Sequence, residues 1–147
     1  MAAVLRARGT EFDPDRFCSK SGFKPCRLYR KGEPVLPATK PEGRKNEDSG
    51  IHVVLSEADF HEFPRQVDEA TAFLEIHKDE LARLRNFPGI EDMTIDFGIA
   101  RRDVIVQSDY LPPCLIRMAG ELGLGIEISQ YPIFEDEETA QPAGRDS

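Results

Sequence analysis

The segment from Leu111 to Pro132, LPPCLIRMAGELGLGIEISQYP, constrains the fold more than any other part of the chain. Its two prolines favour the start of a helix, because the first helical amides have no partner within the helix in any case. Gly123 suits the left-handed conformation that ends a helix, and Leu124 is expected to fold back onto the last turn. Ile126 and Ile128 then alternate with polar residues, as in a half-buried strand. The segment therefore predicts a short helix that returns the chain onto a sheet.

Four further segments are predicted to be strands. Residues 93–99, MTIDFGI, alternate strictly between apolar and polar or small side chains, which is typical of a strand with one buried face. Residues 2–8 and 51–57 alternate less cleanly, and residues 24–32 follow a short predicted helix. Pro132 is expected to end the last strand or to mark a sheet edge.

The longest predicted element is an amphipathic helix from Phe63 to Asn86, in which apolar residues recur at spacings of three, four or seven. A shorter helix is predicted within residues 11–22, with Asp13 as its N-cap and Pro14 at its first position. The order of elements is strand, helix, strand, strand, long helix, strand, helix, strand. This order predicts an α+β fold: a mainly antiparallel sheet of about five strands, with one long and two short helices packed on one face.

The 147 residues are enough for one domain with a terminal tail. Residues 1–134 are expected to form a single α+β domain that contains a long flexible loop at residues 32–50, where proline and glycine are frequent and no apolar period appears. Residues 135–147 begin with four acids and contain almost no apolar residues, so they are predicted to be a disordered acidic tail.

Charge and apolar content narrow the classes of partner. With 27 acidic and 19 basic residues the formal net charge is -8, which disfavours nucleic acid and anionic membranes and favours a basic protein partner. No apolar run approaches the roughly 18 residues of a membrane helix, and charges follow the start too soon for a signal peptide. A cytoplasmic protein is therefore expected.

The three cysteines are Cys18, Cys26 and Cys114. Their odd number and the lack of C-x-x-C spacing predict neither a disulfide framework nor a zinc site. They are expected to be buried small thiols.

Three features together resemble a family of small bacterial proteins of unknown function, DUF4279: RLYRKGEP at residues 27–34, the long amphipathic helix, and the segment from Leu111 to Pro132. The resemblance covers roughly residues 10–132. The chain departs from the family pattern where a tryptophan is expected before the KG pair, because Tyr29 and Arg30 occupy that region and the chain has no tryptophan. The resemblance implies the α+β fold and brings no established activity.

Candidate binding residues come from the outward positions of the predicted strands. If these strands are neighbours, one sheet face presents a polar surface with two aromatic side chains, suited to a ligand or a protein partner. The alternative is a solvated face held by cross-strand ion pairs. No catalytic residues, metal site or cofactor are predicted. The candidate face consists of Arg6, Arg8, Arg27, Tyr29, His52, Asp96, Glu127 and Tyr131.

The leading functional hypothesis is a non-catalytic interaction module, in its more specific form an acidic immunity or inhibitor protein that binds a basic partner. The alternative is a small-molecule-binding or enzymatic domain, in which the arginines of the candidate face hold an anion while His52, Asp96 or Glu127 moves protons. That alternative requires a concave pocket. A monomer is compatible with both hypotheses, and so is a homodimer formed through an edge strand.

Overall fold

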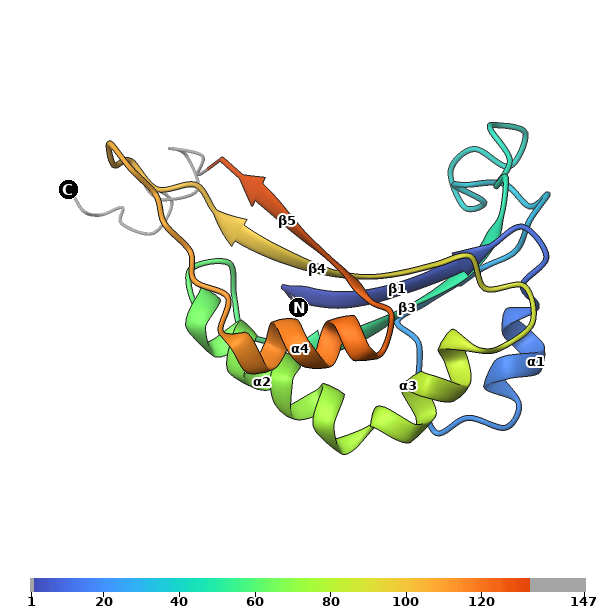
Figure 1. Ribbon diagram of the computed structural model, residues 1–147. Coiled ribbons are helices and arrows are strands. Elements are labelled where there is room, and N and C mark those ends of the chain that lie inside the picture. Colours follow the sequence, from blue (N-terminus) through green and yellow to red (C-terminus); the bar gives the residue numbers. More distant parts are fainter. Residues whose placement is uncertain (1, 133–147) are drawn as a thin grey trace.

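The computed structural model describes residues 2–132, in which helices lie against one side of a single sheet (Figure 1). The predicted tail at residues 135–147 lies outside the described residues. Along the chain the elements are β1 (Ala3–Gly9), α1 (Pro14–Cys18), β2 (Arg27–Tyr29), β3 (Ser49–Ser56), α2 (Phe63–Ile76), α3 (Lys78–Arg85), β4 (Asp92–Ala100), α4 (Pro113–Glu121) and β5 (Gly125–Tyr131).

The five strands form one sheet in the order β2-β3-β1-β4-β5. Neighbouring strands are antiparallel except for β4 and β5, which run parallel. A parallel pair needs a crossover connection, which residues 101–112 and α4 supply. The predicted α+β class with a mainly antiparallel sheet is confirmed.

The core lies between the sheet and the helices. Alternation places Leu5 of β1 and Ile95 of β4 on the helix side, where both are fully buried, and Leu74 and Leu115 meet them from α2 and α4. No helix of residues 2–132 covers the opposite face of the sheet (Figure 1). This uncovered face is called the open face below.

The end of α4 follows the sequence prediction. Gly123 has φ of 73°, a left-handed conformation that glycine adopts without steric cost. The amide of Leu124 donates to the carbonyl of Ala119 at 2.8 Å, and the Leu124 side chain is buried. The helix therefore stops where its last turn can be capped, and the chain enters β5 directly.

The predicted single helix from Phe63 to Asn86 is wrong on one point, because the structure divides it into α2 and α3 at His77. His77 leaves the helical conformation, with φ of -108° and ψ of 23°. Its ring lies 4.3 Å from the ring of Phe73 and 5.6 Å from that of Phe23, centroid to centroid. The break lets the second half of the stripe follow the curved core, so Leu81 is fully buried.

The loop predicted at residues 32–50 is shorter than expected, because Ser49 and Gly50 already belong to β3. The remainder folds back on itself: the Val35 amide donates to the Arg44 carbonyl at 2.8 Å, and the Asn46 amide to the Glu33 carbonyl at 2.8 Å. It stands above one end of the sheet (Figure 1). Its flexibility stays a prediction.

The cysteines differ from expectation. Cys18 is half-buried, but Cys26 and Cys114 are exposed, so the expectation of buried thiols is wrong for these two. Cys26 lies beside β3, where its thiol donates to the carbonyl of His52 at 3.4 Å.

Candidate functional site

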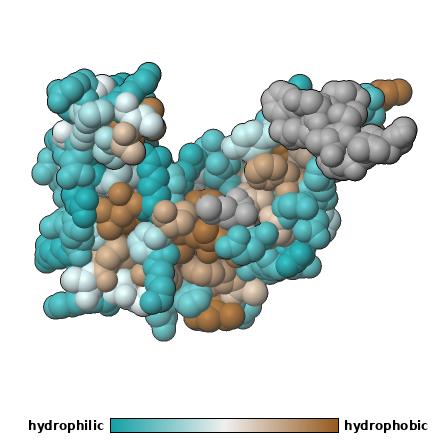
Figure 2. Space-filling view, turned by 180° about the vertical axis from the view of Figure 1, so that it is seen from behind, coloured by the Kyte–Doolittle hydropathy of each residue, from teal (hydrophilic) through white to brown (hydrophobic). Residues whose placement is uncertain are grey.

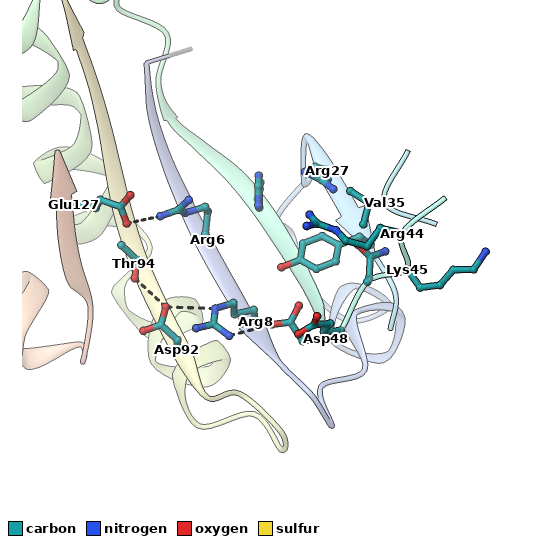
Figure 3. Close-up of a pocket in the computed structure, with 14 residues that line it drawn as sticks. Arg6, Arg8, Arg27, Val35, Arg44, Lys45, Asp48, Asp92, Thr94 and Glu127 are labelled. Carbon is teal, nitrogen blue, oxygen red and sulfur yellow. Dashed lines mark hydrogen bonds and ion pairs between the residues drawn. The ribbon is translucent and has the colours of Figure 1, made fainter. Parts of the chain in front are cut away.

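The open face carries a hollow of about 660 Å³. Side chains from the strands form its base, and residues 35 and 44–48 of the loop line one side. In the space-filling view an indentation separates the mostly hydrophilic projecting loop from the rest of the molecule (Figure 2). Hydrophobic residues gather in the lower centre of the same view. The hollow is thus a concave, largely polar surface between sheet and loop (Figure 3).

A row of basic side chains crosses the base of the hollow. Arg27 of β2 is opposite His52 of β3, and His52 is opposite Arg6 of β1. Paired residues on neighbouring strands present their side chains on the same face, with strands about 4.8 Å apart. The pairing therefore brings two guanidinium groups and one imidazole together in one row (Arg27, His52, Arg6).

A second row of opposed residues lies beside the basic row, with Gly50 of β3 between Tyr29 of β2 and Arg8 of β1. Gly50 has no side chain, which leaves space above β3. A Cβ atom at Gly50 would lie 2.5 Å from the Tyr29 hydroxyl oxygen and 2.7 Å from its Cζ. The Tyr29 ring therefore occupies the space that a side chain on β3 would fill. It lines the hollow together with the basic row.

Two of the arginines are neutralised by acids. Arg6 is 2.7 Å from Glu127 and 3.9 Å from Asp96, measured between nitrogen and carboxylate oxygen. Arg8 is 3.0 Å from Asp48, the last loop residue before β3. These groups are partly exposed, and such pairs contribute about 0 to 1 kcal/mol each. The pairs of Arg6 join different strands, as the alternative of cross-strand ion pairs predicts, whereas the pair of Arg8 with Asp48 joins a strand to the loop.

Two other arginines have no ion pair with any described residue, and both line the hollow. The guanidinium of Arg27 lies over the Tyr29 ring, 5.0 Å from its centroid. Arg44 reaches from the loop toward Arg27, whereas Lys45 extends away from the sheet (Figure 3), and its amine donates to the Pro41 carbonyl at 3.2 Å. Arg27 and Arg44 therefore bring positive charge without an ion-pair partner among the described residues to the side of the hollow formed by β2 and the loop (Figure 3).

Burial and charge set the protonation of the groups between them. Burial lowers the pKa of His52, and the positive charges of Arg27 and Arg6 lower it further, while Asp96 opposes them. The imidazole is therefore neutral at pH 7. Burial, with the negative charge of Asp48, raises the pKa of Tyr29, so its hydroxyl keeps its proton.

The structure brings six of the eight predicted residues to the hollow: Arg6, Arg8, Arg27, Tyr29, His52 and Glu127. Asp96 does not line it, but it contacts Arg6 and accepts a hydrogen bond from the Ser129 hydroxyl at 2.6 Å. Tyr131 lies apart, with its ring stacked on that of Phe60 at 5.1 Å between centroids.

The residues that the sequence interpretation left out of the site come mainly from the loop, with Arg44 and Asn46 as examples. Loop residues carry no alternation that assigns them to a face, so no periodic signal was present. Asp92 and Thr94 of β4 also line the hollow. Thr94 is at a polar position of the alternating segment 93–99, so the alternation alone was sufficient to assign it to the open face.

The described residues contain no group of three or more His, Cys, Asp or Glu side chains arranged to hold a metal ion. In the same part of the chain, no helix combines the length and apolar character that crossing a membrane requires. Comparison with models of protein families and with curated proteins gives no match, so the resemblance to DUF4279 stays a prediction.

The chemistry available in the hollow is that of polar recognition. Guanidinium groups offer several N–H donors in a planar fork that matches the oxygens of carboxylates and phosphates. Two carboxylates of the lining form ion pairs: Glu127 with Arg6, and Asp48 with Arg8. Among the described residues no side chain hydrogen-bonds to the His52 ring, whose ring contact is with Tyr29, at 6.0 Å between centroids in a T-shaped arrangement.

Proposed function

We propose that the protein is a non-catalytic binding module that holds an anionic group of its ligand on the open face of the sheet. The observation that carries this proposal is the pair Arg27 and Arg44, which line one hollow without an acidic partner among the residues described. Two cations that line one hollow without acidic partners repel each other, and an anion bound by both removes that repulsion.

The local charge supports the same proposal. The lining contains five cationic residues and four acids, which gives +1 for a hollow in a chain of net charge -8. A negatively charged ligand meets a net positive lining there. Because the sheet holds Arg27 and the other residues of the base in place, that part of the site needs no ordering when the ligand binds.

Binding is tested by thermal unfolding and calorimetry of the whole chain with a panel of small anions. A bound ligand raises the unfolding temperature as its concentration exceeds its dissociation constant. We expect Arg27→Gln or Arg44→Gln to abolish the shift. Arg117→Gln is the matched control, because Arg117 is exposed on α4 in the helix layer. The proposal is refuted if every anion that binds does so equally well to the Arg27 variant.

A second candidate function is the acidic interaction module, and one observation favours it. Since the residues that line the hollow carry +1, the remainder of the chain carries -9. This distribution would accelerate encounter with a basic protein. A pull-down from host lysate at low and high salt tests it. A basic protein that is lost at high salt and retained by the Arg27→Gln variant supports this module, and the absence of such a protein counts against it.

A further inference from the structure

We infer that the anionic group is a single phosphate monoester carried by a polyhydroxylated small molecule, in other words that the hollow binds a sugar phosphate. This inference rests on the proposed function, because it names the ligand class of the same site. It is carried by the balance of charges in the lining, by the polar character of the remaining side chains and by the size of the hollow.

The number of unpaired cations favours a phosphate over a carboxylate. Arg27 and Arg44 are the two arginines of the lining that no described acid neutralises, while Lys45 extends away from the sheet (Figure 3) and its amine donates to the Pro41 carbonyl. A phosphate monoester carries about -1.5 to -2 at pH 7 and has three acceptor oxygens. A carboxylate carries one charge and two oxygens, so it can satisfy one guanidinium fork fully but not two. His52, directly opposite Arg27 in the sheet, adds one N–H donor beside them.

The remaining lining limits the phosphate to one and favours a hydroxyl-rich body. Four acids also line the hollow, and one of them, Glu47, has no ion pair with a described residue, so its negative charge repels a second phosphate or a polyanion such as nucleic acid. Carboxylates accept hydrogen bonds from hydroxyl groups, and Asn46 and Thr94 can donate or accept them. A volume of about 660 Å³ leaves room for such a body beyond the phosphate.

A nucleotide fits less well than a sugar phosphate. Bases bind to proteins largely by stacking on aromatic rings or other flat surfaces. The lining contains two ring side chains, Tyr29 and His52. The guanidinium of Arg27 lies over the Tyr29 ring, 5.0 Å from its centroid, so that face of the ring is occupied. Val35 is the one aliphatic side chain there. The ligand body is therefore expected to be polar throughout.

The test is isothermal titration calorimetry of the full chain at constant ionic strength. The probes are glucose 6-phosphate, ribose 5-phosphate and glycerol 3-phosphate, compared with glucose, gluconate, inorganic phosphate and AMP. We expect at least one sugar phosphate to bind ten-fold more tightly than every comparison compound. Each lost charge-assisted contact weakens binding by roughly ten- to a hundred-fold. We therefore expect Arg27→Gln and Arg44→Gln each to raise the dissociation constant of the sugar phosphate by that factor, and Arg117→Gln to leave it unchanged.

The outcomes separate this inference from the proposed function. If gluconate or AMP binds as tightly as the sugar phosphates and depends on Arg27, the ligand class is wrong and the binding face stands. The same holds if inorganic phosphate alone binds as tightly, or if none of the sugar phosphates binds while another anion does. If no probe depends on Arg27 or Arg44, both proposals fail. Circular dichroism of each variant confirms that a loss of binding is not a loss of fold.

Discussion

Replacing Gly50 by alanine links the stability of the sheet to the shape of the hollow. The added Cβ atom would lie 2.5 Å from the hydroxyl oxygen of Tyr29 and 2.7 Å from the carbonyl oxygen of Ala7 on the neighbouring strand. Ordinary contacts of this kind are 3.4 Å or longer. The Tyr29 ring must therefore withdraw by roughly 1 Å, and β1 and β3 must separate slightly as well.

The expected magnitude follows from two opposing effects. Overpacking at a well-packed site costs about 1 to 3 kcal/mol. Alanine also restricts the unfolded chain, which returns about 0.4 to 1 kcal/mol where the backbone tolerates it. The φ angle of Gly50 is not in the left-handed region, so this gain applies. We expect the Gly50→Ala variant to be less stable than wild type by about 1 to 2 kcal/mol.

Urea unfolding followed by circular dichroism measures this change, since the chain has no tryptophan for fluorescence. Gly125→Ala is the matched control on β5, because the nearest atom to its added Cβ is 3.7 Å away and no clash arises. In a Tyr29→Ala background the cost of Gly50→Ala should fall by about 0.5 to 1 kcal/mol, because only the Ala7 clash remains. A Gly50→Ala protein as stable as the Gly125→Ala control would refute the reasoning.

Three further predictions concern the stability of the fold. Gln66 is fully buried and its amide donates to two backbone carbonyls at 3.0 and 2.8 Å, so Gln66→Leu should cost about 2 to 4 kcal/mol in urea unfolding; a neutral result would contradict this role. Asp13 caps α1 by accepting a hydrogen bond from the Arg16 amide at 3.1 Å. Asp13→Ala should therefore lower the free energy of unfolding by about 1 kcal/mol, whereas Asp13→Ser, which also caps, should keep most of the wild-type stability. Hydrogen bonds from arginines lower the pKa values of Asp15 and Glu80 in the folded state. The two ionised carboxylates therefore contribute to the free energy of unfolding above the unfolded pKa values of 3.8 and 4.5. This contribution is lost as the pH falls through the lower pKa values of the folded state. Stability measured from pH 6 down to pH 2 should fall over that range, and a flat profile would count against it.

Local chemistry in the sequence predicted most of the elements and one face of the sheet. Strict alternation assigns Ile95 to the core and Thr94 to the open face whatever the neighbours of the strand are. Gly123 marks the end of α4 because few other residues adopt a positive φ without strain. The outward positions of Arg6 and Arg27 follow from the same alternation, so the basic row was predictable once their strands were predicted.

Contacts between distant segments determined the rest. Nothing near His77 breaks a helix in sequence terms, since neither proline nor glycine occurs there, and its packing with Phe23 is a tertiary contact. Strand order depends on which edges meet, so the parallel pairing of β5 with β4 had no local signal. Arg44 reaches the hollow only because its loop folds back, which depends on hydrogen bonds such as that from the Val35 amide.

The position of β1 has a consequence for how the molecule is assembled. The earliest of the five described strands lies in the middle of the sheet, between β3 and β4, so Ala3 is opposite both Ser56 and Phe97. During translation β1 can pair with β3 early, but its second edge stays open until residues 92–100 have left the ribosome. Such long sequence separations slow folding. Deleting the first nine residues would leave β3 and β4 without a common neighbour, so an N-terminal truncation should be far more damaging than its length suggests.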